Sequence, residues 1–217
     1  MFKEELYTDM VVICGGRKWK CHRAVLCSRC SFFKAACAGK FKVHGNNPGM
    51  TIRKLTDDLQ EASTLTLKLD DDSPEAIDML LKYLYLLQIP NFRDKAVFSD
   101  TYKAASLALV LGDKYDLQEL YLAGVNELKA FIEERLSHWE SKPEKSKEAW
   151  ITWFREVWKW TQKDADSIRE HIIKRLVSMA ESITQDAKFQ DFIWENREFG
   201  MAFILALSKR KQSHDEV

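Results

Sequence analysis

The sequence predicts an α+β fold, a small mixed sheet flanked by a cluster of helices, which is followed by an all-helical C-terminal extension. Two observations carry this prediction. Strand-like apolar segments occur only at residues 9–22 and 64–70, whereas apolar residues recur every three or four positions from residue 73 onward. With 217 residues, of which 46% are hydrophobic and 30% charged, the chain is long and apolar enough for one large domain or a domain with an appendage.

The N-terminal part begins with two short strands, expected at residues 9–14 and 17–22. They are separated by Gly15-Gly16, and a tight hairpin turn needs the positive φ angles that glycine adopts readily. Residues 23–38 contain neither glycine nor proline and predict two short helices that break near Ser31.

A loop and a third strand come next. Residues 42–63 include the run Gly45-Asn46-Asn47-Pro48-Gly49, which predicts an exposed loop. Residues 64–70 alternate between apolar and polar side chains, so they predict a strand whose leucines face the core.

Helices fill the rest of the chain. Ser73 is a suitable cap and Pro74 a suitable first residue for the helix that follows them. Two further helices are expected at about 100–111, ending at Gly112, and at about 117–134. The polar segment 137–148 predicts a linker, and three helices with apolar stripes are expected beyond it. The predicted domains are therefore 1–136 and 149–217, joined by this linker.

Charge and cysteine content narrow the functional class. The 33 basic and 33 acidic residues cancel, which argues against a protein held directly on nucleic acid or on a membrane surface by its overall field. The start of the chain carries acidic residues and no apolar run, so we expect no secretory signal and a cytoplasmic or nuclear location. In such a reducing compartment the five cysteines are expected to be free thiols.

Three strings, taken in order, resemble one known family. The first is Tyr7–Ile13, an aspartate followed by an apolar run. The second is Trp19–Phe33, which contains a His-Arg pair, a Val-Leu pair and two adjacent phenylalanines. The third is Leu67–Ala76, followed by Leu81–Tyr85 with its Tyr-Leu-Tyr. The chain resembles the BTB/POZ domain, particularly its short fungal versions, over roughly residues 7–135. It departs from that pattern by inserting about twenty residues after Phe41-Lys42.

The resemblance implies a non-enzymatic protein interaction module that forms homodimers or higher homo-oligomers and uses no cofactor or metal. It places Asp9 and Arg23 at the charged groove of the dimer; the alternative is that Asp9 caps the strand entry and Arg23 is a surface charge. It makes a set of positions structural: His22, Phe32, Tyr83 and Tyr85. The helical extension is expected to hold a further protein partner.

Cullin-type ubiquitin ligase recruitment is a finer implication. Leu59-Gln60-Glu61 fits the hydrophobic-x-Glu pattern through which some BTB proteins contact a cullin scaffold, and Phe33 is expected to contribute to that contact. The alternative is that these residues only end an exposed loop. A second hypothesis is a transcription-linked dimer that binds co-regulator peptides.

A third hypothesis belongs to a different class, a zinc or thiol-redox protein. Cys27 and Cys30 have the two-residue separation that metal ligands and redox pairs use. The alternative is that they fill a helix face as small apolar side chains.

Overall fold

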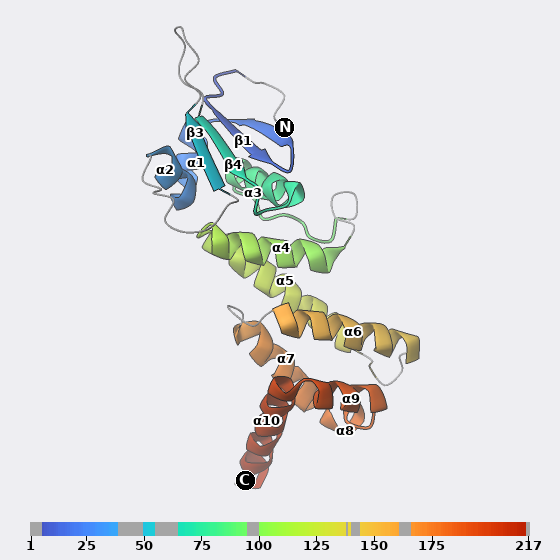
Figure 1. The fold of residues 1–217 in the computed structure, drawn as a ribbon. Helices are drawn as coiled ribbons and strands as arrows, with labels where there is room; N and C mark the ends of the chain where they lie inside the picture. Colours follow the sequence, from blue (N-terminus) through green and yellow to red (C-terminus); the bar gives the residue numbers. More distant parts are fainter. Residues whose placement is uncertain are drawn as a thin grey trace. The chain divides into compact units, whose positions relative to one another are not determined.

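The computed structural model describes residues 6–38, 50–54, 65–94, 100–137, 139, 144–160 and 166–215 (Figure 1). The chain divides into two compact units, Met1–Val125 and Asn126–Val217. Within the described residues, no helix has both the length and the apolar character needed to cross a bilayer.

The first unit contains a four-stranded mixed sheet in the order β2-β1-β4-β3. Its strands are β1 (Met10–Cys14), β2 (Arg17–Cys21), β3 (Met50–Lys54) and β4 (Leu65–Leu69). β1 pairs antiparallel with β2 and parallel with β4, while β3 pairs antiparallel with β4. The predicted hairpin and the predicted strand at 64–70 are confirmed. The hairpin turns at Gly15 and Gly16, whose φ angles are 51° and 80°.

β3 corrects the prediction that residues 42–63 form only a loop. This strand lies at the edge of the sheet, and Ile52 is opposite Leu67 of β4. An edge strand of five residues is stabilised mainly by its pairing with a neighbour, which is a tertiary contact. Local sequence, dominated here by glycine, asparagine and proline just before the strand, did not reveal it.

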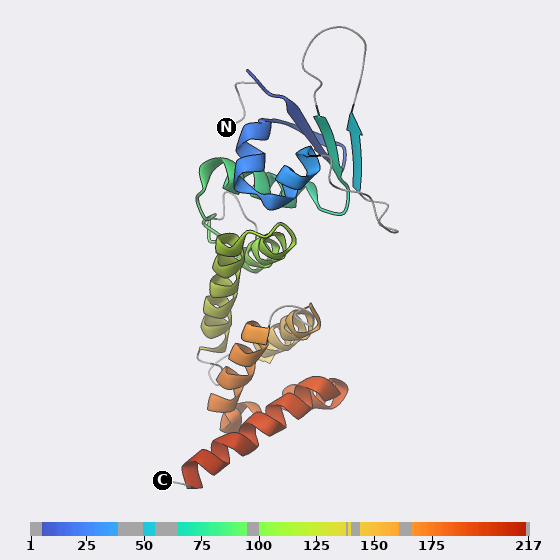
Figure 2. The same ribbon diagram turned by 90° about the vertical axis from the view of Figure 1, so that its left-hand side faces the viewer.

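One face of the sheet is buried beneath helices. Met10, Val12 and Cys14 have no exposed surface, whereas Val11 and Ile13 between them are only half-buried, as the period of two requires. In Figure 2 the helices α1 (Arg23–Arg29) and α2 (Ser31–Cys37) lie together beside the sheet. They are separated by Cys30 in an extended conformation with φ −144°, so the predicted break near Ser31 is confirmed.

Three longer helices follow: α3 (Pro74–Leu86), α4 (Thr101–Lys114) and α5 (Gln118–Leu136). The first unit ends within α5 at Val125, and the rest of that helix belongs to the second unit. α3 begins as predicted, because the Ser73 hydroxyl accepts a 3.1 Å hydrogen bond from the Ala76 N–H and Pro74 occupies the first position.

The expected end of α4 at Gly112 is wrong. The helix continues to Lys114, and Gly112 instead lies against the backbone of Tyr121 in α5. Gly124 of α5 also lies close to α4, since a β-carbon there would be 2.7 Å from the Ala105 carbonyl oxygen. Glycine at these two positions therefore permits α4 and α5 to pack backbone against backbone.

The second unit is entirely helical in its described part. Its helices are α6 (Glu144–Trp160), α7 (Asp166–Ser178), α8 (Ala180–Ile183), α9 (Ala187–Glu195) and α10 (Arg197–Asp215). α6 starts inside the segment 137–148 that was expected to be a linker. The sequence predicts three helices in this region, and the structure has five. The short helix α8 was not predicted, and the last predicted helix is divided at Asn196 into α9 and α10.

Aromatic side chains form the core of this unit. Phe154 has no exposed surface, and its ring packs at centroid distances of 5.0 to 5.3 Å against Trp150, Phe192 and Phe199. The predicted aromatic stripe of α6 is therefore a packing face for α9 and α10.

Candidate protein interface

His22 joins three segments of the first unit. Its Nε2 lies 3.0 Å from the Leu6 carbonyl oxygen, which can only accept, so Nε2 carries the proton. Its Nδ1 lies 2.9 Å from the Tyr85 hydroxyl, and that hydroxyl also accepts a 2.8 Å hydrogen bond from the His22 backbone N–H. The neutral tautomer satisfies all of these contacts at once: the Tyr85 O–H donates to Nδ1 and Nε2–H donates to Leu6. With both ring nitrogens engaged, His22 serves as a connection between segments and has no free lone pair for proton transfer.

Asp9 holds the start of α1. Its Oδ1 accepts a 2.7 Å hydrogen bond from the backbone N–H of Arg23, the first residue of α1. A carboxylate at the N-terminal end of a helix is stabilised by the helix dipole. The backbone of Asp9 bonds to Cys21 of β2 and to Leu65 of β4. The contact observed between Asp9 and Arg23 is thus a helix cap. Their assignment to a charged dimer groove remains a prediction.

Arg29 attaches α1 to the far end of α3. Its Nη1 donates to the carbonyl oxygens of Leu84 and Tyr85, at 2.6 and 2.9 Å. These carbonyls belong to the last turn of the helix, where no intrahelical donor remains, and a cation is favourable there. Arg29 and His22 together therefore fix the C-terminal turn of α3 against α1.

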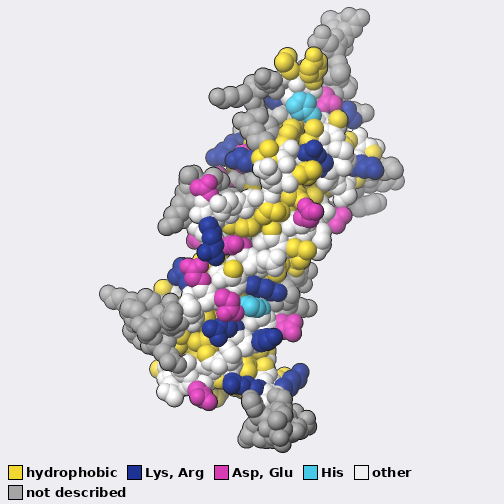
Figure 3. Space-filling model, turned by 180° about the vertical axis from the view of Figure 1, so that it is seen from behind, with side chains coloured by type: hydrophobic (Ala, Val, Ile, Leu, Met, Phe, Trp, Pro, Cys, Tyr) yellow, Lys and Arg dark blue, Asp and Glu magenta, His cyan; other side chains and the backbone are white. Residues whose placement is uncertain are grey.

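Large apolar side chains are exposed around this junction. Leu6, whose carbonyl accepts from His22, and the adjacent Tyr7 are 65% and 91% exposed. Leu86, Leu87 and Ile89 at the end of α3 are 43 to 54% exposed. We call these five residues the α3-end surface. Figure 3 shows hydrophobic side chains gathering on one face of the molecule. Such gatherings of exposed apolar side chains mark interaction sites.

Two residues of the α3-end surface have an unfavourable backbone conformation. Tyr7 has φ 64° and Leu87 has φ 51°, in the left-handed region that favours glycine. Leu87 ends α3 in this conformation, and its N–H donates to the Tyr83 carbonyl oxygen at 2.7 Å. For a non-glycine residue this backbone conformation costs about 1 to 2 kcal/mol of free energy. Because both side chains are exposed, their contacts within the chain offset little of that free energy.

The family assignment agrees with this architecture. A family model described as the BTB/POZ domain matches residues 1–129, which is more than half of the chain. The chain belongs to the BTB/POZ family. No curated protein matches the chain. The BTB/POZ domain is a protein interaction module, so the exposed faces of the first unit are where its function is to be sought.

The burial of the adjacent aromatic residues Phe32 and Phe33 differs from what the cullin hypothesis requires. Phe33 has no exposed surface, so it cannot contact a partner and the assignment of Phe33 to a cullin contact is corrected. Phe32 is half-buried and packs edge-on against Tyr115 at 4.8 Å. Two adjacent aromatics on a short helix look alike in sequence, and only the position of the sheet decides which one is buried. Leu59 and Glu61 lie outside the described residues.

Tyr83 and Tyr115 hold the BTB helices together. Tyr83 is 5% exposed and its hydroxyl lies 3.3 Å from a carboxylate oxygen of Glu119. The fully buried Tyr115 donates a 2.6 Å hydrogen bond to Asp72 Oδ2, and burial, reinforced by that bond, raises the pKa of Tyr115 well above its usual range. Lys114 reaches the same oxygen at 2.8 Å. The acidic turn that contains Asp72 is therefore anchored to the end of α4.

The thiols of Cys27 and Cys30 have different partners. Cys30 is 3% exposed and its thiol lies 3.5 Å from the Tyr115 carbonyl oxygen. The Cys27 Sγ lies 2.7 Å from the Sγ of Cys37 and 3.4 Å from the Phe33 carbonyl oxygen. The hypothesis of a site built from Cys27 and Cys30 is thus corrected. Within the described part of the chain, no three His, Cys, Asp or Glu residues gather in a metal-binding arrangement.

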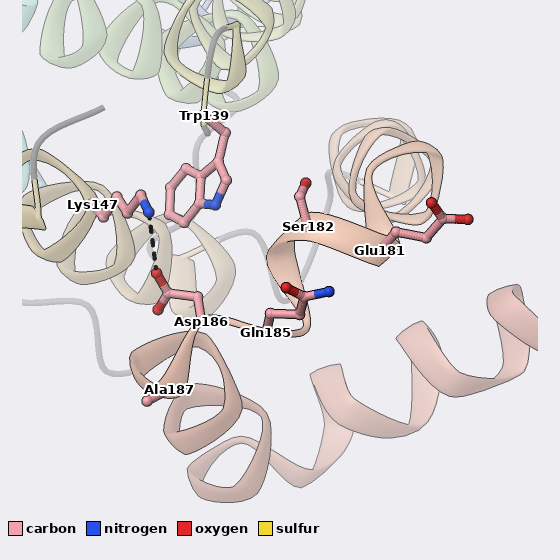
Figure 4. A pocket seen from close by; sticks show the side chains of 7 residues that line it. All are labelled: Trp139, Lys147, Glu181, Ser182, Gln185, Asp186 and Ala187. Atoms are coloured by element: carbon pink, nitrogen blue, oxygen red, sulfur yellow. Dashed lines mark ion pairs between the residues drawn. The ribbon is translucent and has the colours of Figure 1, made fainter. Parts of the chain in front are cut away.

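The second unit contains a polar cavity of about 580 Å³ (Figure 4). It is lined by Trp139, Lys147, Glu181, Ser182, Gln185, Asp186 and Ala187. Asp186 is occupied as the cap of α9, since its Oδ1 accepts 3.1 Å hydrogen bonds from the N–H groups of Lys188 and Phe189. Ser182 donates to the Met179 carbonyl. These lining groups serve the local backbone, so the cavity offers no activated nucleophile.

Neither the α3-end surface nor the partner of Cys27 was predicted from the sequence. The signal for the first was present in Leu86-Leu87-Gln88-Ile89-Pro90, an apolar run that continues past the point where the helix must end. Nothing in the ten-residue separation of Cys27 and Cys37 indicated their contact, because it depends on the angle between two helices.

Proposed function

We propose that this BTB/POZ protein is a non-enzymatic adaptor that forms a homodimer or a larger homo-oligomer through its α3-end surface. The observation that supports this most directly is the exposure of Leu87 and Tyr7 in left-handed backbone conformations. A cost of this kind at an exposed apolar position is recovered when a partner covers the side chain.

The partner that we propose is a second copy of the chain. Covering one exposed leucine stabilises an interface by about 1.5 to 3 kcal/mol, and a two-fold axis makes every residue contribute twice. The 33 basic and 33 acidic residues leave no net charge to oppose the approach of two copies.

Leu87→Asp tests the proposed interface. We expect the substitution to raise the dissociation constant of the full-length oligomer at least about 100-fold, because two carboxylates would be buried in an apolar contact. Aspartate tolerates the left-handed conformation at this position, so the fold itself is retained. The dissociation constant is measured by sedimentation equilibrium.

Leu122→Asp is the matched control. Leu122 is 46% exposed, close to the 54% of Leu87, but it lies near the start of α5 and outside the α3-end surface. It is expected to leave the dissociation constant within about threefold of the wild type. Equal association of Leu87→Asp and wild type would show that the oligomer forms elsewhere.

The adaptor is further proposed to recruit a cullin-type scaffold in the cytoplasm or nucleus through Leu59-Gln60-Glu61. This part rests on the sequence motif alone. With the full chain immobilised, Glu61→Ala is expected to reduce capture of purified cullin at least about tenfold, because a charged hydrogen bond is lost. Asp57→Ala removes an acid from the same segment outside the motif and is expected to have no effect. Equal capture by wild type and Glu61→Ala would contradict the cullin contact and favour the alternative, a dimer that binds co-regulator peptides.

A further inference from the structure

Two cysteines of the BTB unit lie in direct contact. The Sγ atoms of Cys27 in α1 and Cys37 at the end of α2 are 2.7 Å apart, and both thiols are free. A disulfide needs about 2.05 Å between its sulfurs, so a shift of less than about 1 Å would bring them to bonding distance. Neither α1 nor α2 has to unfold for this approach.

The pair is also the one that solution reagents can reach. Cys27 and Cys37 are half-buried, whereas Cys14 and Cys21 have no exposed surface and Cys30 is 3% exposed. All five cysteines of the chain fall within the described residues, so this comparison covers every thiol of the protein.

We propose that Cys27 and Cys37 are a reversible redox site that forms an intramolecular disulfide with low-molecular-weight disulfides such as glutathione disulfide. In the first step the Cys37 thiolate attacks one sulfur of the small disulfide, which releases one small thiolate and leaves a mixed disulfide on Cys37. In the second step the Cys27 thiolate attacks the Cys37 sulfur and releases the other small thiolate. The two protein thiols lose two electrons and two protons, and the small disulfide gains both and becomes two thiols.

The order of the two steps follows from the environment of Cys27. Burial, together with the hydrogen bond and charge of neighbouring Cys37, raises the pKa of Cys27 to about 12, so its thiolate is scarce at neutral pH and Cys37 is the thiol that reacts first. Because burial is the main cause of the raised pKa of Cys27, ring closure is expected to accelerate as the pH rises above neutral.

The bond would fasten α1 to α2. α1 also carries His22 at its cap and Arg29 at its end, the two residues that hold the α3-end surface. Oxidation of Cys27 and Cys37 therefore restrains α1, the helix whose cap residue His22 contacts the α3-end surface. Disulfides of this kind in reducing compartments are transient and responsive to redox state.

The test uses the full chain and glutathione disulfide, with remaining thiols alkylated before trypsin digestion and mass spectrometry. Trypsin places each cysteine on a separate peptide: Glu4–Arg17, Cys21–Arg23, Ala24–Arg29, Cys30–Lys34 and Ala35–Lys40. We expect the disulfide-linked pair of Ala24–Arg29 with Ala35–Lys40 to exceed every other linked pair at least about tenfold, and to disappear on reduction.

Substitutions separate the two steps. Cys27→Ser is expected to retain glutathione on Cys37, because the resolving thiol is missing, whereas Cys37→Ser forms no linked pair. Cys30→Ser, a change at a thiol with other partners, leaves the pair intact. Circular dichroism of each reduced variant verifies folding. Recovery of Cys27 and Cys37 as alkylated thiols or as stable mixed disulfides in the wild-type chain, or linkage of Cys27 to Cys30 instead, would overturn the proposal.

Discussion

Gly112→Ala is expected to lower the free energy of unfolding of the BTB unit by about 3 kcal/mol or more. In an unconstrained helix this substitution stabilises by about 1 kcal/mol, because alanine is the better helix former. Here a β-carbon would overlap the backbone nitrogen of Tyr121 and lie 2.5 Å from its Cα. Backbone atoms cannot rotate away as a side chain does, so α4 and α5 must separate, and the loss of their packing outweighs the gain in helix propensity.

Hydrogen exchange of the α4 and α5 peptides, combined with denaturant titration, measures this effect in the unit where it arises. Lys103→Ala, on an exposed position of the same helix, is expected to stay within about 0.5 kcal/mol of the wild type. A Gly112→Ala variant as stable as the wild type would contradict the backbone-to-backbone packing of α4 and α5.

Phe154→Ala is expected to destabilise the second unit by about 3 to 5 kcal/mol. The ring is fully buried and contacts rings from α6, α9 and α10, so its removal leaves a cavity at the point where these helices meet. Six of the seven tryptophans lie beyond residue 138, which makes intrinsic fluorescence a specific reporter of this unit during thermal unfolding.

The control for Phe154→Ala is Leu205→Ala in α10. Leu205 is 54% exposed and its truncation is expected to change the unfolding midpoint little. If both variants shift the fluorescence transition equally, the aromatic cluster around Phe154 is not the core of the second unit.

Local sequence was sufficient where an element is determined by its own residues. The start of α3 follows from Ser73 and Pro74, and the hairpin turn follows from Gly15 and Gly16, because caps and positive φ angles are local requirements. The order of strands and helices, together with the three sequence strings, resembles the BTB/POZ domain for the same reason.

Features set by contacts between distant segments could not be predicted in this way. Gly112 has the sequence appearance of a helix end, yet its role is decided by the proximity of Tyr121. Phe33 was expected at a partner contact, and its burial depends on where the sheet lies. The same holds for the candidate site, because the hydrogen bonds of His22 connect Leu6 to Tyr85 in the last turn of α3, and these residues are far apart in the chain.

Self-association of the BTB unit is tested most directly by the molar mass of the wild-type full chain in solution. Multi-angle light scattering over a dilution series from high to low micromolar concentration gives that mass without a variant or a label. The proposed function predicts at least twice the 25.3 kDa of one chain at the high concentrations, with dissociation on dilution governed by a single constant. A mass of one chain throughout the series would contradict the proposed role of the α3-end surface.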